Sequence, residues 1–140
     1  MTIAQVLQGR RVLIAHESAF QCSYLSEGVR AAGATVVGPV QVIADGIALL
    51  DCKPRVDAMV LSQALPHWDA VALVEAAISQ DIRPVIVHPA QADLAHPFSD
   101  FSCLAMPYAA FQVVAALADV LAATRGCIHW SARTIDGSWA

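Results

Sequence analysis

The sequence is short of charge, and above all of positive charge. Charged residues make up 14% of the 140 positions, the net charge at pH 7 is -4, and Lys53 is the one lysine. A typical soluble domain is about 25% charged, and disordered segments combine high charge with few apolar residues. A protein that binds nucleic acid needs a basic surface. The composition therefore excludes a disordered chain, argues against nucleic acid and favours protein partners.

Long hydrophobic runs and closely spaced cysteines are also missing. The most apolar stretch, 104–123, is interrupted by Pro107, which leaves a periodic segment shorter than the ~20 residues of a membrane-spanning helix. The first eleven residues lack the apolar region of a signal peptide. No two cysteines form a Cys-x-x-Cys motif. We therefore interpret the four cysteines as small apolar core residues of a protein in a reducing cytoplasm. We therefore expect a cytoplasmic protein without a membrane partner.

Apolar residues are abundant, at 57% of the chain, and they follow two alternating patterns. Short apolar runs typical of buried parallel strands alternate with segments of helical period. The predicted strands are 11–16, 34–37, 56–62, 84–88 and 101–105; the predicted helices are 18–32, 43–50, 69–78 and 109–123, with a weak one between 90 and 96. This order predicts one α/β domain with a doubly wound parallel sheet. Residues 1–10 are a lead-in, 11–124 the domain and 125–140 an arm.

Ligands of such sheets bind outside the carboxyl ends of the strands. The residues predicted at those ends are His16 and Glu17, Ser62, His88 and Pro89, and Met106 and Pro107. They are remote in sequence, but the fold is expected to bring them together.

Three of these positions carry a resemblance to a known family. The segment 62–70 follows the pattern Asp-x-x-Met/Leu-Pro-x-x-Asp-Gly with serine at the first position, Met106-Pro107 stands where the pattern has Lys-Pro, and His16-Glu17 stands where it has two acidic residues. Over residues 11–123 the chain resembles a CheY-like response-regulator receiver domain of two-component signalling. The resemblance implies a flavodoxin-like (βα)5 fold and a cis peptide before Pro107.

The resemblance also implies that the chemistry of the family is lost. Family receivers bind Mg²⁺ with the acidic pair and an aspartate, which accepts a phosphoryl group contacted by a Thr/Ser and a Lys. Here Ser62 holds the phosphoacceptor position, His16 and Glu17 the acidic pair, Pro89 the Thr/Ser position and Met106 the Lys position. Mg²⁺ prefers carboxylate oxygens, and a serine needs a base to become an acceptor. This implies a degenerate receiver, or pseudo-receiver, that has no cofactor and is not an enzyme.

Two other chemistries at the same residues remain open on the sequence. A metal held by His16, Glu17 and His88 is one, and a Ser-His-acid nucleophile or a phosphorylated Ser62 is the other. No HxH, HExxH or Gly-x-Ser-x-Gly spacing supports them. Neutral groups filling a vacated acidic pocket are favoured, with His88, Trp68 and Pro107 as residues that line it. Trp68 covers the pocket, meets a partner or packs on the sheet edge.

The last helix points to protein contact. Its predicted core stripe is Phe111, Val114, Leu117, Val120 and Leu121. The rest of the helix carries little charge, and a large apolar patch usually marks an interface; the interface candidates are Val113, Ala116 and Val120. In the family, the surface around helices one, four and five dimerises or docks partners. We therefore expect a stand-alone signalling protein of two-component (phosphorelay) type that forms a homodimer and binds a signalling partner.

Overall fold

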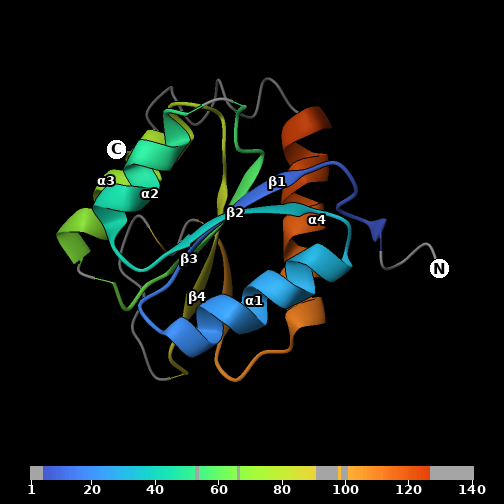
Figure 1. Ribbon diagram of the computed structural model, residues 1–140, viewed down its shortest axis with the longest axis horizontal. Helices are drawn as coiled ribbons and strands as arrows, with labels where there is room; N and C mark the ends of the chain where they lie inside the picture. The colour runs from blue at the N-terminus through green and yellow to red at the C-terminus, as the bar shows by residue number, and fades with distance from the viewer. Residues whose placement is uncertain (1–4, 53, 66, 91–97, 99–100, 127–140) are drawn as a thin grey trace.

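Five parallel strands form a single sheet in the order β2-β1-β3-β4-β5 (Figure 1). The computed structural model describes residues 5–52, 54–65, 67–90, 98 and 101–126. The strands are β1 (Arg11–Ala15), β2 (Thr35–Val40), β3 (Ala58–Ser62), β4 (Pro84–His88) and β5 (Ser102–Ala105). The helices are α1 (Ala19–Ala31), α2 (Ile43–Leu50), α3 (His67–Ile78) and α4 (Ala110–Gly126). The predicted flavodoxin-like α/β fold is therefore confirmed.

The helices cover both faces of the sheet. Figure 1 shows α2 and α3 on one side of the strands and α1 and α4 on the other. Successive side chains of a strand point to opposite faces, so Leu13 and Met59 join the core under α2 and α3, whereas Val12 and Val60 join the core under α1 and α4. Because both faces are covered, the central strands read as continuous apolar runs.

The segments around the strands extend this core. Leu7 in the lead-in is fully buried, and its N–H donates to the carbonyl of Ala32 at 2.9 Å. The Met106–Pro107 peptide is cis, as the resemblance implied, and Gly38–Pro39 is cis as well. The helix expected between 90 and 96 lies outside the described residues. Of the arm expected at 125–140, residues 125 and 126 belong to α4 instead, and the remainder also lies outside the described part. Within the described part, none of the helices has both the length and the apolar content to cross a bilayer.

The prediction for α4 is confirmed at Leu117, which is fully buried, and at Val114, Val120 and Leu121, which pack partly buried against the core; it is wrong in the first turn. Phe111, expected in the core, is 74% exposed, whereas Val113, expected at an interface, is 1% exposed. Ala116 and Val120, the other interface candidates, are partly buried against the same core. The start of the helix fixes this rotation, because a Cβ at Gly28 of α1 would lie only 2.7 Å from the Ala110 Cβ.

Candidate functional site

The candidate site lies where β1 and β3 end side by side. The parallel register pairs Ala15 with Leu61, so the residues that follow each strand meet. The Ser62 hydroxyl donates a hydrogen bond to Glu17 Oε1 at 2.6 Å, and the Ala64 N–H donates to the same hydroxyl oxygen at 3.2 Å. Ser62 is 2% exposed. Ser62 is thus a buried hydroxyl that already has a carboxylate partner.

His16 stands beside this pair as a buried imidazole. It is 3% exposed, and its Nδ1 accepts a hydrogen bond from the Ser18 N–H at 3.0 Å. Burial lowers the pKa of His16 below its ordinary value of 6.5, while the Glu17 carboxylate raises it in part. His16 is therefore neutral at pH 7, and its 3.2 Å approach to Glu17 Oε1 is not an ion pair in that state.

The loop that carries these residues is tied to β2 as well. The His16 N–H donates to the Val40 carbonyl at 3.0 Å, and Gln41 Nε2 donates to the Glu17 carbonyl at 3.0 Å. Together with the Ser62–Glu17 bond, these contacts join the carboxyl ends of β1, β2 and β3. Hydrogen bonds between mostly uncharged groups therefore hold this end of the sheet together.

The predicted residues of β4 and β5 lie along the neighbouring strands. The Met106 N–H donates to the His88 carbonyl at 2.8 Å, and His88 Nδ1 lies 2.8 Å from the carbonyl oxygen of Pro89. Pro89 and Pro107 are exposed, whereas His88 and Met106 are half-buried. The Trp68 side chain lies outside the described part.

The metal and nucleophile alternatives lose their geometric basis. Among the described residues, no three His, Cys, Asp or Glu side chains lie close enough to hold a metal ion. His88, on β4, therefore does not complete a site with His16 and Glu17. The Ser62 hydroxyl donates to Glu17 and not to an imidazole nitrogen, so the order of a Ser-His-acid nucleophile is not formed.

The donor set also does not fit the Mg²⁺ of the family. Glu17 supplies the carboxylate of the cluster, and the other two positions hold a hydroxyl and a buried neutral imidazole. Mg²⁺ requires hard oxygen ligands in octahedral geometry. We therefore derive no chemical step through a metal ion at this site.

Sequence reasoning missed a cluster that joins α1 to the loop before α4. The Tyr108 hydroxyl donates to Gln21 Oε1 at 2.6 Å, and the Tyr24 hydroxyl accepts from the Ala110 N–H at 2.9 Å. Burial raises the pKa of Tyr108 to about 12, with smaller effects of Tyr24 and Glu17. The signal in the sequence was the tyrosine directly after Met106-Pro107, but a single sequence does not reveal its partner.

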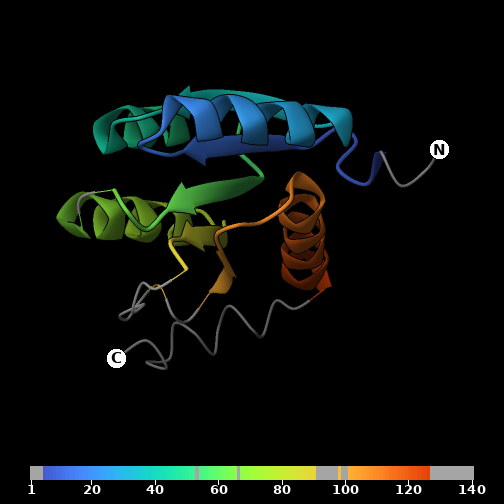
Figure 2. The ribbon, with the colours of Figure 1, turned by 90° about the horizontal axis from the view of Figure 1, so that it is seen from below.

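Exposed aromatic side chains gather near this cluster. Phe20 and Phe111 are each 74% exposed, and the Phe20 ring stacks on Tyr24 with centroids 6.4 Å apart. Tyr24 in turn contacts Ala110, the residue before Phe111. Figure 2 shows the C-terminal end of α1 beside the first turns of α4, where Gly28 approaches Ala110. We call the surface formed by Phe20, Tyr24 and Phe111 the α1–α4 face.

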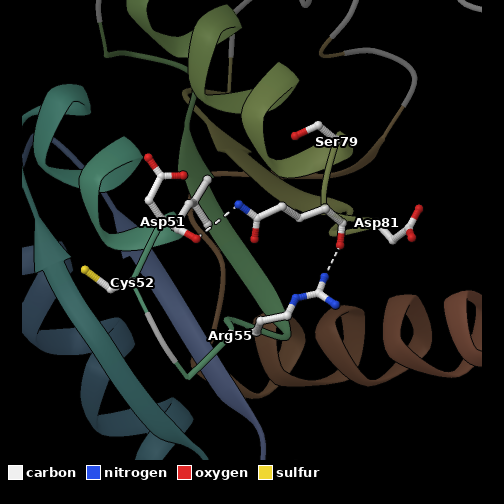
Figure 3. Close-up of a pocket in the computed structure, with 7 residues that line it drawn as sticks. Asp51, Cys52, Arg55, Ser79 and Asp81 are labelled. Carbon is white, nitrogen blue, oxygen red and sulfur yellow. Dashed lines mark hydrogen bonds between the residues drawn. The ribbon is translucent and has the colours of Figure 1, made fainter.

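A separate hollow of about 390 Å³ lies at the other end of the strands (Figure 3). Gln80 Nε2 donates to the Leu50 carbonyl at 3.0 Å. Arg55 lies in the segment before β3, and its guanidinium donates to the Gln80 carbonyl. Asp51 and Asp81 also line the hollow. Because its charged groups have both signs, the hollow does not favour a ligand of one charge.

Comparison with solved structures identifies the fold. No protein-family model matches the sequence, and no curated protein does. The BeF3-activated conformation of SdrG from Pseudomonas melonis Fr1 is 24% identical with a TM-score of 0.68, and the alignment covers 84% of this chain and 98% of that one. A response regulator receiver protein from Sinorhizobium medicae WSM419 is 19% identical with a TM-score of 0.67, over 84% and 98%.

A CheY-like receiver domain protein from Methanospirillum hungatei JF-1 gives the same result at 14% identity, with a TM-score of 0.67 over 83% of this chain and 97% of that one. These alignments span nearly the whole of each neighbour. At such identities the likeness establishes the fold. The chain therefore has the fold of response-regulator receiver domains.

Proposed function

We propose that this chain is a degenerate receiver of two-component (phosphorelay) signalling, which acts by binding proteins and is not phosphorylated on aspartate. The observation that carries the proposal is the state of Ser62. By the resemblance it stands at the phosphoacceptor position; its side chain is 2% exposed, and its hydroxyl donates a hydrogen bond to Glu17. A hydroxyl that is buried to this extent is closed to a phosphodonor in solution.

The neighbouring positions support the same proposal. Phosphoryl transfer needs cationic groups to balance the charge on the equatorial oxygens. Met106 offers a thioether in place of the lysine ammonium. Glu17 is the one carboxylate at the three positions where the family binds Mg²⁺, because His16 and Ser62 hold the other two. In this proposal the chain is a cytoplasmic binding protein without enzymatic activity or cofactor, and a partner delivers the signal.

The alternative of Ser62 as the target of a serine kinase gains no support from the geometry. A kinase must place the hydroxyl in line with the γ-phosphate of ATP. Ser62 would first have to leave the end of β3 and give up its bond to Glu17. The alternative of a metal-regulated pocket gains no support either, since the described residues contain no group of three His, Cys, Asp or Glu side chains placed to hold a metal ion.

The α1–α4 face is the surface that we propose for docking, with a second copy of the chain as its occupant. Two exposed phenylalanines desolvate favourably on contact, and aromatic residues are enriched in the centres of interfaces. Most of the exposed positions of α4 within the described side chains are uncharged: Phe111, Gln112, Ala115, Ala122 and Ala123. Two copies can therefore approach without strong repulsion between like charges.

The proposed loss of phosphotransfer is tested with a phosphoryl mimic. ¹⁵N-labelled protein is titrated with millimolar Mg²⁺ and then with Mg²⁺ and beryllofluoride, while the amide signals of Glu17, Ser62 and Met106 are followed. A phosphorylatable receiver domain under the same conditions serves as the positive control. We expect no saturable shift at the three amides of this chain. A saturable response centred on them would contradict the proposal.

A further inference from the structure

The imidazole of His16 has two contacts that require opposite protonation states of one atom. Nδ1 accepts from the Ser18 N–H at 3.0 Å, which uses its lone pair. The same Nδ1 lies 3.2 Å from Glu17 Oε1, an oxygen that can interact favourably with it when Nδ1 carries a proton. One nitrogen cannot satisfy both partners at the same time, so the two contacts compete.

We propose that His16 is a proton-operated switch: the neutral ring binds the Ser18 amide, and the protonated ring donates to Glu17 and releases that amide. The proposal adds a mode of regulation to the site described above, and its consequence for docking rests on the proposed function. Both partners are already within contact distance of Nδ1. Transfer between them therefore requires a proton and a small change of the loop.

Among the described ionisable groups near His16, Glu17 is the one that carries a charge and acts on the imidazole; the others are uncharged. From α1, the Cys22 Sγ lies 3.4 Å from the His16 carbonyl oxygen, and burial raises the pKa of this thiol. From the loop before α4, Tyr108 faces Glu17, and its pKa is about 12. Both groups are uncharged in neutral and acidic solution.

The other strands contribute uncharged groups to the surroundings of His16. β2 presents the Val40 carbonyl, and β3 presents the Ser62 hydroxyl. Burial is the larger influence on His16 and lowers its pKa, with Glu17 acting against it. The neutral state is therefore the state at pH 7, and the switch operates below the ordinary histidine pKa of 6.5.

The released amide belongs to the residue that caps α1. Ser18 has extended backbone geometry, and its Oγ accepts from the Gln21 N–H at 3.2 Å. A cap of this kind fixes the first turn of a helix. That turn carries Phe20, which is part of the α1–α4 face. Protonation of His16 thus displaces the start of α1 and weakens docking on this face.

The experiment follows the imidazole nitrogens directly. In ¹⁵N-labelled full-length protein, the chemical shifts of Nδ1 and Nε2 of His16 are recorded from neutral to mildly acidic pH, together with the amide signals of Ser18 and Phe20. We expect Nδ1 without a proton at neutral pH, a midpoint below 6.5, and Ser18 and Phe20 amide shifts with the same midpoint.

Two variants and one control make the experiment specific. Glu17→Gln removes the carboxylate that attracts the proton and is expected to lower the midpoint further. Ser62→Ala frees Glu17 Oε1 from its hydrogen bond and is expected to raise it. Glu27→Gln, which removes an exposed carboxylate elsewhere on α1, is the matched control and is expected to leave the midpoint in place.

Three results would overturn the proposal. They are a protonated Nδ1 at neutral pH, a Glu17→Gln shift no larger than that of Glu27→Gln, or a Ser18 amide that does not follow the ring. None of them concerns the binding of beryllofluoride. Failure of the switch is therefore distinguishable from failure of the proposed function.

Discussion

At the carboxyl ends of β1 and β3, the polar side chains of His16 and Ser62 are buried and hydrogen-bonded, whereas on the α1–α4 face aromatic side chains lie in solvent. Ser62 and His16 are 2% and 3% exposed, but Phe20 and Phe111 are each 74% exposed. Burial of polar groups is tolerated when their hydrogen bonds are satisfied. Exposure of large apolar groups suits a surface that is covered by a partner. This difference is the basis of our proposal that the chain acts by docking through its helices and not by phosphotransfer in its pocket.

The largest expected effect separates the buried and exposed sides of α4. Leu117→Ala removes a fully buried side chain and is expected to lower the free energy of unfolding by about 3 kcal/mol. Phe111→Ala removes a larger but exposed side chain and is expected to change it by less than about 0.5 kcal/mol. Urea denaturation of both variants measures the two values. Similar losses for both would show that α4 is rotated as the sequence pattern predicted.

The second prediction concerns the exposed aromatic residues. The double variant Phe20→Ser, Phe111→Ser is expected to weaken self-association by at least about tenfold, because hot-spot aromatics each contribute more than about 1 kcal/mol. Sedimentation equilibrium measures the dissociation constant. Val42→Ser is the control, since Val42 is 57% exposed at the start of α2. A monomeric wild-type protein, or equal losses in variant and control, would contradict the dimer and leave another protein as the occupant.

The third prediction concerns the hydrogen bond at the carboxyl ends. Ser62→Ala removes the donor to Glu17 Oε1 and is expected to cost about 1 kcal/mol of folding free energy, since Glu17 can recover part of the loss from water. Ser79→Ala removes a hydroxyl that is bonded to the Ala76 carbonyl on the surface. It is expected to have a smaller effect in the same denaturation assay. If Ser62→Ala lowers the free energy of unfolding no more than this control does, the Ser62–Glu17 hydrogen bond does not stabilise the carboxyl ends of β1 and β3.

The smallest expected effect is the dependence of stability on pH. The pKa of His16 is lower in the folded protein than its ordinary value of 6.5, so the unfolded chain binds the proton first as the pH falls. Stability is therefore complete above 6.5 and declines between that value and the lower folded pKa, by at most about 1.4 kcal/mol per pH unit. Denaturation of wild type and His16→Asn across this range isolates the contribution of the histidine. An equal decline in both would assign it to other groups.

The sequence predicted the carboxyl ends of β1 and β3 better than it predicted the α1–α4 face. The alternation of apolar runs and helical segments predicted the parallel sheet, because strand and helix periods are local properties. The predicted strands at 11–16 and 56–62 also placed Glu17 and Ser62 at the same end of that sheet. Their hydrogen bond required the register of Ala15 with Leu61, which a sequence pattern does not specify.

The orientation of α4 could not be predicted in the same way. Alanine and valine occur on most sides of this helix, so the apolar period is weak and several rotations bury a similar area. The close approach of Ala110 to Gly28 selects one of them. That contact joins residues far apart in the chain, and it is what turned Val113 inward and Phe111 outward.

The sequence by itself determined the fold and which residue types stand at the ends of the strands, because both depend on local patterns. The tertiary structure decided what the remaining residues do. It directed the hydrogen bond of the Ser62 hydroxyl to Glu17, placed Ser18 and Glu17 in competition for one nitrogen of His16, and exposed Phe20 and Phe111. These outcomes depend on distances between segments remote in sequence, which packing alone establishes.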